Sequence, residues 1–484
     1  MTPILGLLML LGVALGAVAT GLPVWGILIG VANLGAALAM LTGAIEPGIF
    51  FALPNRVVGL LESDLLQALP LFAAMGALLN RLPLADTLFR AGLGVSGGRP
   101  TGAPAAALML GAVLGPMNGS VSANAIALTR SVEPALTRRH VRPADRIALI
   151  AVASTLGVLV PPSLVLILLG DAMMTAHTIA LNSTGRIARI VNTQDVFRGA
   201  MLPAALFLGA CLVIATVRGL RTRGTSTLRE RLSPRDWITA GATLCFIATL
   251  LAGVASGAFY AVEAAAMGAV GLCLAGWLGG GLDGPRLRGA LDDTIAMTGA
   301  LLALLIAATT FTLVFRILGS DKLIASWMSA APGGPLGIVL LGLGLIALAA
   351  FVLDAFEIIF VLIPIIMPPM LMRADDAVWV AVLTLLVLQT SFLLPPLGYA
   401  LMMTRSAASA AAPLGAIAKS LAPFLIAQML IVAAVIAWPA LTHPGRSSQA
   451  IAAQPTASEA DIQQRFQQMM PPPLEMPDLG PPKL

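Results

Sequence analysis

Apolar runs recur along the whole chain, separated by short polar or basic segments. We count about ten to twelve such runs, each about long enough to cross a hydrocarbon core of ~30 Å as an α-helix. Several of them are interrupted by polar residues, glycine or proline. The pattern predicts an all-α polytopic membrane protein in which some membrane segments are broken.

Segment 102–136 does not fit a single crossing, because basic residues flank it on both sides, at Arg99 and at Arg138. Its middle reads GPMNGSVSANA, where glycine and asparagine tolerate turn conformations and proline cannot continue a helix. The sequence therefore predicts a re-entrant hairpin with its tip near Asn118. Such a tip is tolerated at membrane depth only inside protein or beside a wet cavity. Two ordinary short helices joined by a surface turn are the alternative.

The next apolar segment, 147–170, is predicted to be a broken helix. Pro161 and Pro162 interrupt it, and small or polar residues precede them at Ser154, Thr155 and Gly157. Consecutive prolines remove backbone donors and end regular helix.

The second half of the chain repeats this arrangement. A long apolar segment, 335–370, is interrupted by Asp354 and is predicted to form a second hairpin. The following segment, 377–403, is predicted to break at Pro395 and Pro396. Thr390 and Ser391 precede this break, and Gly398 follows it.

The spacing of these features indicates an internal repeat. Pro134 and Pro161 are 27 residues apart, and so are Pro368 and Pro395. Because the first hairpin has basic flanks and the second has nearly neutral ones, the positive-inside rule favours repeats of opposite orientation. The predicted organisation is a first membrane repeat (1–216), a basic cytoplasmic connector (217–237), a second repeat (238–441) and a disordered tail rich in proline and glutamine (442–484).

Composition supports the membrane assignment. Hydrophobic residues make up 58% of the chain and charged residues only 11%; soluble proteins average about 25% charged residues. The net charge of +5 comes from short basic loops, as expected of cytoplasmic loops, so nucleic-acid binding is not implied. The sequence contains no ATP-binding P-loop and no zinc-protease or nucleophile-elbow motif, so no enzyme and no cofactor are expected.

Broken helices supply the chemistry that a transporter needs. Their half-helix N-termini present N–H groups to anions, while free carbonyls and hydroxyls suit Na⁺. A first substrate or ion site is expected where the hairpin tip meets the first broken helix, and its predicted residues are Asn118, Gly119, Ser120, Ser122, Ser154, Thr155 and Gly157. A second is expected around Asp354, Thr390, Ser391, Pro396 and Gly398. For each hydroxyl the simpler alternative is a bond to the preceding turn of its own helix.

The charged residues within apolar segments receive separate interpretations. Asp354 is costly at membrane depth and indicates function, or else it caps a helix inside the hairpin. Glu357 lies on the same helix face. We expect Arg316 to snorkel toward the interface. We expect Arg130 and Glu133, three residues apart, to pair with each other.

The motifs ALPLFAAMGALLNRLPLADTLFR, GPMNGSVSANA, ASTLGVLVPPS, NTQDVFRGAMLPA, FVLDAFEIIFVLIPIIMPP and LLPPLGYALMM carry a family resemblance. In this order, over residues 1–440, the chain resembles the large membrane subunit of tripartite ATP-independent periplasmic (TRAP) transporters, the DctM-like family. Two departures stand out: the first tip reads Asn118-Gly-Ser rather than a Ser-Gly-Ser pattern, and Leu394 stands where threonine often precedes the second proline pair.

The resemblance implies a function and partners. It implies an elevator-type symporter of the bacterial inner membrane that takes up an organic acid, such as a dicarboxylate, on a Na⁺ gradient. It implies a periplasmic binding protein that delivers the substrate, and a small four-helix Q subunit as a separate chain. Na⁺ is expected at Ser120, Ser154, Thr155 and Gly157 and at Asp354, Thr390 and Ser391, with H⁺ as an alternative coupling ion. A stand-alone carrier of tricarboxylates or divalent anions, or a membrane-embedded enzyme using Asp354 and Glu357, are the other readings.

Overall fold

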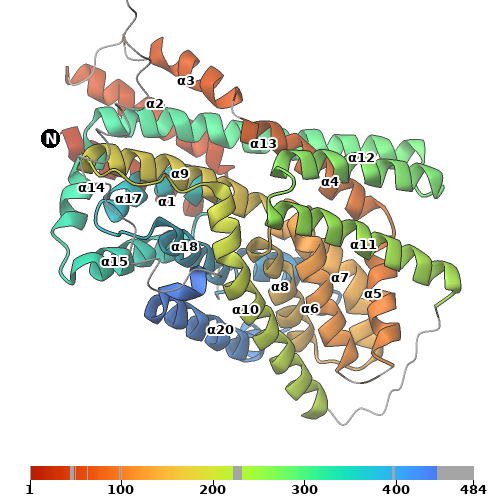
Figure 1. Ribbon diagram of the computed structural model, residues 1–484. Helices are drawn as coiled ribbons and strands as arrows, with labels where there is room; N and C mark the ends of the chain where they lie inside the picture. The colour runs from red at the N-terminus through yellow and green to blue at the C-terminus, as the bar shows by residue number, and fades with distance from the viewer. Residues whose placement is uncertain are drawn as a thin grey trace, which may run out of the picture.

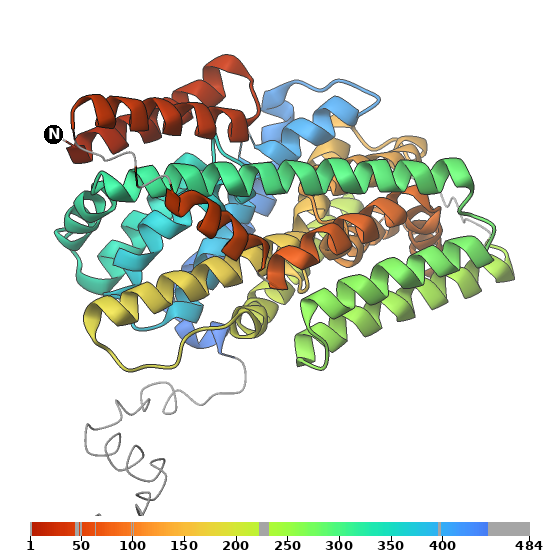
Figure 2. The same cartoon turned by 90° about the horizontal axis from the view of Figure 1, so that it is seen from above.

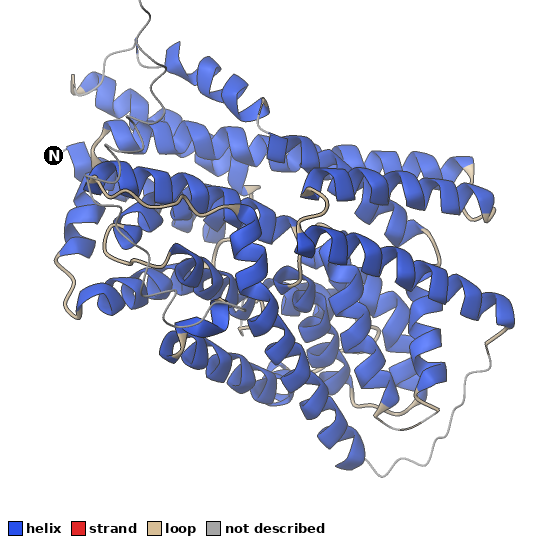
Figure 3. Cartoon of the chain, in the orientation of Figure 1, coloured by secondary structure: helices blue, strands red, loops and turns tan. Residues whose placement is uncertain are grey.

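The computed structural model describes residues 2–43, 48, 51–62, 64–97, 99, 101–221, 232–394 and 398–443. Every regular element in these ranges is a helix (Figure 3). Pro395, Pro396, residues 222–231 of the basic connector and the predicted tail beyond residue 443 lie outside the described residues.

The helices fall into a peripheral set and a more buried central set, and most of the peripheral helices lie along the upper side of the molecule in Figure 1. The peripheral helices are α1 (Thr2–Thr20), α2 (Val24–Leu41), α3 (Ala52–Leu61), α4 (Asp64–Arg81), α5 (Leu84–Val95), α11 (Pro234–Ser256), α12 (Ala261–Leu278), α13 (Gly284–Ile317) and α14 (Ser320–Ser329). Helix α13 has 34 residues and runs across the whole molecule (Figure 2), contacting both α2 and α4. It links the two ends of the molecule.

The centre contains the hairpins and the broken helices. Its elements are α6 (Gly102–Leu114), the short 3₁₀ helix η2 (Gly115–Met117), α7 (Val121–Arg138), α8 (Pro143–Leu159), α9 (Leu164–Thr184), α15 (Gly334–Ala349), α16 (Ala355–Glu357), the π-helical segment η3 (Ile358–Leu362), α17 (Ile363–Leu371), α18 (Ala377–Ser391) and α19 (Tyr399–Ala407). Two long helices, α10 (Thr193–Arg221) and α20 (Leu414–Ala437), pack beside α8 and α18, and a 3₁₀ turn, η4 (Pro439–Thr442), follows.

The helices begin and end where the sequence provides caps. Ser163 starts α9 by accepting a hydrogen bond from the Leu166 backbone N–H at 3.1 Å. Asp376 starts α18 in the same way, by accepting from the Trp379 N–H at 2.9 Å. Gly185 ends α9 with a φ of 64°, a conformation that glycine adopts without a Cβ clash.

Fewer helices qualify as simple spans than the ten to twelve predicted from hydrophobic runs. Among the described residues, eight helices are long and apolar enough to cross a membrane, or nine if the bent pair α4–α5 forms one span. The four shorter apolar helices are hairpin arms and a half-helix: 102–117, 334–349, 355–371 and 377–391. The difference arises because a re-entrant hairpin enters and leaves on the same side, and a broken helix crosses in two shorter pieces. The first broken helix also extends beyond residue 170, since α9 continues to Thr184.

The two halves correspond element by element. Helices α7 and α16 begin 234 residues apart, at Val121 and Ala355, and so do α8 and α18, at Pro143 and Ala377. The packing is exchanged in the same way: α7 packs on α19 while α17 packs on α9, and α8 contacts α19 while α18 contacts α9. Reciprocal contacts of this kind are what a twofold axis produces. The hairpins and broken helices therefore form one body with internal pseudo-twofold symmetry.

The middle of this body is the most buried part of the protein. In α8 every residue from Arg146 to Leu159 is buried, and in α18 nearly every residue from Ala377 to Ser391 is buried. Peripheral helices instead expose large apolar side chains, such as Val18 (67%) and Ile238 (72%), as a lipid-facing surface does. The chain is thus a multi-pass membrane protein with a protein-enclosed centre.

Candidate functional site

The first hairpin reverses direction through a short, irregular tip. The 3₁₀ turn η2 ends at Met117 and is followed by Asn118, Gly119 adopts a φ of 65°, and Ser120 is extended before α7 begins. A left-handed residue is needed at the reversal, and glycine provides it without strain. Ser120 makes no side-chain capping bond, so the first N–H groups of α7 are left without a side-chain acceptor.

The tip lies directly against the first broken helix. A Cβ added at Gly157 would collide with the backbone of Gly115 and Pro116, and one added at Gly111 would collide with the Ala153 carbonyl. On the other side of the tip, a Cβ at Gly76 of α4 would come within 2.7 Å of the Asn118 carbonyl oxygen. Three glycines therefore let three backbone segments approach at van der Waals distance.

A chain of buried amides ties the tip to α8. Asn118 Nδ2 donates to Asn124 Oδ1 at 2.9 Å, and Asn124 Nδ2 donates to the Ser154 carbonyl at 2.9 Å. Both asparagines are buried, with 2% and 1% of their surface exposed. Asn124 was not among the residues predicted from the sequence, although a second asparagine within an apolar hairpin arm was a usable signal.

The direction of these bonds fixes the chemistry of the tip. The Ser154 carbonyl can only accept, so Asn124 must present its NH₂ group to it and its oxygen to Asn118. Asn118 must then donate, which leaves Asn118 Oδ1 as a buried atom without a partner. A free buried oxygen can bind a cation or a hydrogen-bond donor, and it repels an anion.

A recess opens between the tip and the first break. It encloses about 260 Å³ of empty space, counting its open side. The predicted residues Gly119, Ser120, Ser154 and Gly157 line it, together with Gly115, Val121, Val158, Ser163, Leu164 and Val165. The structure thus brings most of the first predicted group together around one recess.

The remaining first-group residues lie beside this recess. Ser122 shares a hydrogen bond of 2.8 Å with Ser120 across their hydroxyls. Thr155 is fully buried in α8, and its hydroxyl donates to the Val152 carbonyl at 2.9 Å. Ser154 donates likewise to Ala151. Both hydroxyl protons therefore bond within their own helix, as the simpler interpretation anticipated, which leaves their lone pairs for other partners.

The first break itself is compact. Pro161 and Pro162 are joined by a cis peptide bond, and α9 resumes at Leu164. Ser163 also donates to the Val158 carbonyl at 2.9 Å, so its hydroxyl connects the two halves of the broken helix.

The second hairpin has a tip of different chemistry. Asp354 precedes α16 in an extended conformation, and its backbone N–H donates to Glu357 Oε2 at 2.9 Å. The chain then widens into the π-helical segment η3, a feature that is frequent at functional sites. Asp354 and Glu357 both lie within electrostatic range of the Tyr399 hydroxyl at the start of α19.

In the second broken helix, the hydroxyl groups before the break donate hydrogen bonds to backbone carbonyls of the same helix. Thr390 donates to the Leu386 carbonyl at 2.7 Å, and Ser391 donates to the Leu388 carbonyl at 2.6 Å. Gly398 returns close to the chain before the break, where a Cβ would come within 2.7 Å of the Phe392 carbonyl oxygen. Pro395 and Pro396 fall outside the described residues. The described hydrogen bond of Asp354 is with Glu357, whereas Thr390 and Ser391 bond within α18.

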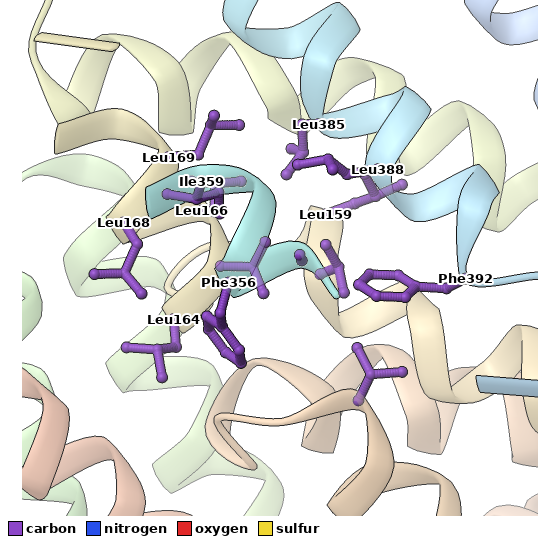
Figure 4. Close-up of a cluster of buried hydrophobic side chains, with 14 of the residues drawn as sticks. Leu159, Leu164, Leu166, Leu168, Leu169, Phe356, Ile359, Leu385, Leu388 and Phe392 are labelled. Atoms are coloured by element: carbon purple, nitrogen blue, oxygen red, sulfur yellow. The ribbon is translucent and has the colours of Figure 1, made fainter. Parts of the chain in front are cut away.

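An apolar cluster lies where the second hairpin meets the two broken helices. Leu159 and Leu164 from the first broken helix, Phe356 and Ile359 from the second hairpin, and Leu388 and Phe392 from α18 lie together (Figure 4). The second hairpin therefore packs apolar side chains against both broken helices.

Two predicted roles for charged residues were wrong. Arg316 does not snorkel to the interface; its Nη2 donates to the Pro364 carbonyl at 3.2 Å. That carbonyl lacks its normal helical donor because residue 368, four positions later, is proline. Glu133 does not pair with Arg130; it accepts from the Ser409 N–H at 3.1 Å and from its hydroxyl at 2.8 Å.

Comparison with known proteins places the chain among membrane transporters. A family model described as "Tripartite ATP-independent periplasmic transporter, DctM component" matches residues 11–441. The C4-dicarboxylate TRAP transporter large permease protein DctM of Pseudomonas aeruginosa is 24% identical over 415 residues, covering 85% of this chain and 92% of that protein. The sialic acid TRAP transporter large permease protein SiaM of Vibrio cholerae is 24% identical over 438 residues, covering 88% and 95%.

A solved structure supports the fold. The YdaH transporter of Alcanivorax borkumensis, whose structure is described as having an unusual topology, superposes with a TM-score of 0.56. It shares 18% sequence identity, and the alignment covers 81% of this chain and 89% of that one.

Proposed function

The chain belongs to the family of DctM components of tripartite ATP-independent periplasmic transporters, and we propose that it uses a Na⁺ gradient to import an organic acid. The observation that carries the proposal is the locked orientation of Asn118. Its free Oδ1 is a neutral oxygen ligand, held at the hairpin tip by Asn124 and the Ser154 carbonyl.

A cation suits the first site better than an anion does. The predicted residues around the recess, Gly119, Ser120, Ser154 and Gly157, supply uncharged oxygens from side chains and backbone. Hard cations such as Na⁺ bind oxygen ligands, and helix breaks supply them at membrane depth. We assign Ser120, Ser154, Thr155 and Gly157, with Asn118, to this first ion position.

The substrate carboxylate has a separate place to bind. The N-terminus of α7 presents N–H groups without a side-chain cap, and the hydroxyls of Ser120 and Ser122 lie beside it. A helix N-terminus favours an anion. The names of the two relatives refer to C4-dicarboxylates and sialic acid, both of which carry carboxylates. We therefore propose that a carboxylate binds at this end of α7, next to the coupling cation.

The second hairpin is proposed to hold the second coupling ion. Asp354 is the carboxylate, with Thr390, Ser391, Pro396 and Gly398 as its predicted companions. Glu357 lies beside Asp354, and Tyr399 is within electrostatic range of it, so this position could carry H⁺ in place of Na⁺. Replacing Asp354 by Asn would remove the charge and keep the size of the side chain, and we expect it to lower the number of charges moved per substrate.

The proposed setting is the bacterial inner membrane, with two partners. The family is tripartite, so we propose a small Q subunit in the membrane and a periplasmic protein that delivers the substrate. The pseudo-twofold body, which comprises the hairpins and broken helices, would move as an elevator against the peripheral helices. Its pseudo-twofold axis would lie in the membrane plane, as in inverted repeats.

Uptake in proteoliposomes containing the chain and its cognate partners tests the proposal. A panel of dicarboxylates, keto acids and sialic acid would be offered with and without an inward Na⁺ gradient. We expect uptake of at least one acid to require the gradient, and Asn118→Ala to raise the Na⁺ concentration for half-maximal uptake.

The matched control is Asn33→Ala. Asn33 is an exposed asparagine of α2 that donates only to its own helix, at the Ile29 carbonyl. Equal uptake with and without Na⁺ would reject Na⁺ coupling, and a proton gradient that replaces it would favour the H⁺ alternative. A wild-type response in Asn118→Ala would reject the site assignment.

A further inference from the structure

One hydrogen bond joins equivalent positions of the two repeats. Gln389 Nε2 in α18 donates to Thr155 Oγ1 in α8 at 3.2 Å, and the two residues are 234 residues apart. This is the offset that relates the starts of α7 and α16 and of α8 and α18. Two equivalent residues that touch each other must lie on either side of the pseudo-twofold axis. The axis therefore passes between Thr155 and Gln389.

The bond has a fixed direction and no access to water. Both residues are fully buried, at 0% exposure. The Thr155 hydroxyl donates its proton to the Val152 carbonyl, so it can only accept from Gln389. Gln389 must therefore turn its NH₂ group to Thr155, which leaves its Oε1 buried without a partner. The neighbouring residues Leu385 and Leu388 of α18 lie in the apolar cluster shown in Figure 4.

The same bond meets the chain of amides at the first tip. Thr155 follows Ser154, whose carbonyl holds Asn124, and Asn124 in turn holds Asn118. If α18 moved against α8, Gln389 would pull on Thr155 and so displace the Ser154 carbonyl, which positions the tip through Asn124. Helix α18 of the second repeat is therefore connected through these hydrogen bonds to Asn118, whose Oδ1 is free, in the first repeat.

We propose that Gln389 is a positioning residue at the pseudo-twofold axis, which couples the second broken helix to cation binding at the first hairpin tip. This inference rests on the proposed function. It assigns Gln389 no direct contact with substrate. Its role is to hold Thr155, and hence the first break, in the arrangement in which Asn118 Oδ1 is available.

The test is a double-mutant cycle measured by Na⁺-dependent uptake. The variants are Gln389→Leu, Thr155→Val, the two combined, and the exchanged pair Thr155→Gln with Gln389→Thr. We expect each single variant to raise the Na⁺ concentration for half-maximal uptake at least ~5-fold, the lower end of measured coupling between sites. The combined variant should be no worse than the poorer single one, because both remove the same bond.

The exchanged pair uses the symmetry itself. If the two positions are equivalent across the axis, glutamine at 155 and threonine at 389 should form the bond in the opposite direction and recover at least half of the loss. Thr155→Ser, which keeps the hydroxyl, should stay close to wild type. If the exchanged pair does not fold, the Leu–Val cycle still decides the question.

Gln428→Leu is the matched control. Gln428 of α20 is also a fully buried amide with a free oxygen, and its Nε2 donates to the Leu386 carbonyl of the same helix α18. It makes no bond between equivalent positions of the repeats. We expect it to lower thermal stability while leaving the Na⁺ dependence of uptake unchanged.

Two results would overturn the inference while leaving the proposed function intact. In the first, wild-type uptake requires Na⁺ and the Gln389→Leu variant shows the same Na⁺ dependence as the wild type. The other is single effects that multiply in the combined variant, which would mean that Thr155 and Gln389 act separately. A wild type whose uptake does not need Na⁺ would instead overturn the proposed function, and this inference with it.

Discussion

The two hairpin tips occupy equivalent positions and carry different chemistry. Ser120 and Asp354 each precede the helix that leaves the tip, and they are 234 residues apart. Around Ser120 the groups are uncharged hydroxyls and amides, whereas Asp354 stands beside a second carboxylate at Glu357. The two repeats thus share a backbone arrangement that interrupts the hairpin at its tip. The side chains at each tip determine which ligand that tip can bind.

The difference extends one turn further along each hairpin. Asn124 of the first hairpin bonds to α8, while the equivalent residue of the second, Ile358, is fully buried and apolar. The first tip is therefore fixed by directed hydrogen bonds and the second by apolar packing. A neutral, rigid tip can leave one oxygen free at a defined place, and a charged tip can neutralise the ion that it binds.

The largest expected effect comes from closing the gap between the first tip and the first break. Gly157→Val places side-chain atoms where the Gly115 and Pro116 backbone lies, and backbone cannot move aside without displacing the hairpin. We expect uptake to be abolished, with a loss of about 1–3 kcal/mol or more in stability from overpacking. Uptake and thermal unfolding of the purified protein would measure both.

Two variants serve as controls for this prediction. Gly299→Ala in α13 adds a methyl group with nothing within 4 Å, and it should behave as wild type. Ser391→Gly alters the position equivalent to Gly157 in the second repeat, where a side chain is already accommodated, so it should introduce no overpacking; it is the control for thermal unfolding alone, because Ser391 belongs to the proposed second ion position. Equal damage at 157 and 391 would show that the two breaks are packed alike.

The next effect concerns the amide chain. Asn124→Leu leaves the Asn118 NH₂ group buried without its partner, at a cost of roughly 1–3 kcal/mol, and the Ser154 carbonyl, which lies within α8, loses its bond from the hairpin. Denaturant unfolding should show the loss of stability, and uptake should need more Na⁺. Asn33→Leu removes only an exposed bond within α2 and is the control. Unfolding free energies that match in the two variants would contradict the role given to Asn124.

Much of this arrangement was predictable because its causes are local. Proline pairs, glycine and small polar residues interrupt apolar helices wherever they occur, so both hairpins and both breaks could be placed from the sequence. The hydrogen bond from the Asp354 backbone N–H to the Glu357 carboxylate could also be predicted from the sequence, since the two residues are three positions apart.

The contacts between distant segments were not predictable in this way. Arg316 bonds to Pro364, Glu133 to Ser409 and Gln389 to Thr155, each across a long stretch of sequence. Local spacing suggested Arg130 as the partner of Glu133, and Arg316 was expected to snorkel, because the sequence does not show which helices are neighbours. The Gln389–Thr155 bond was accessible in principle, since the proline spacing already contains the offset of 234.

A smaller effect is expected at the return arm of the second hairpin. Pro368 removes the donor for the Pro364 carbonyl, and Arg316 replaces it. Arg316→Leu should cost about 1.5–3 kcal/mol, as expected for a hydrogen bond from a charged group. The first hairpin has the equivalent proline at 134, but the carbonyl that it frees belongs to the exposed Arg130, where no such donor is required.

Restoring the donor tests this explanation. Pro368→Ala returns a backbone N–H to the Pro364 carbonyl and should recover part of the stability lost in Arg316→Leu, as measured by thermal unfolding. Pro134→Ala in an Arg316→Leu background should give no such recovery. If Pro368→Ala lowers stability in that background as well, Arg316 does not stabilise the protein by replacing the missing backbone donor.

The smallest effect is expected at the contact between the first hairpin and the second broken helix. Glu133 of α7 accepts from the backbone N–H and the hydroxyl of Ser409, just after α19. The reciprocal contact, α17 on α9, has Met367 at the position equivalent to Glu133, so only one of the two exchanged interfaces carries this bond. Ser409→Ala removes the hydroxyl and keeps the N–H, so we expect a loss of about 1.5 kcal/mol, the lower end for a hydrogen bond to a charged group. Ser326→Ala, which removes an exposed hydroxyl bonded to its own helix, is the control for unfolding measurements. A cost well above that of the control would mean that the exchanged interfaces differ in strength as well as in chemistry, whereas no cost would mean that apolar packing alone holds both.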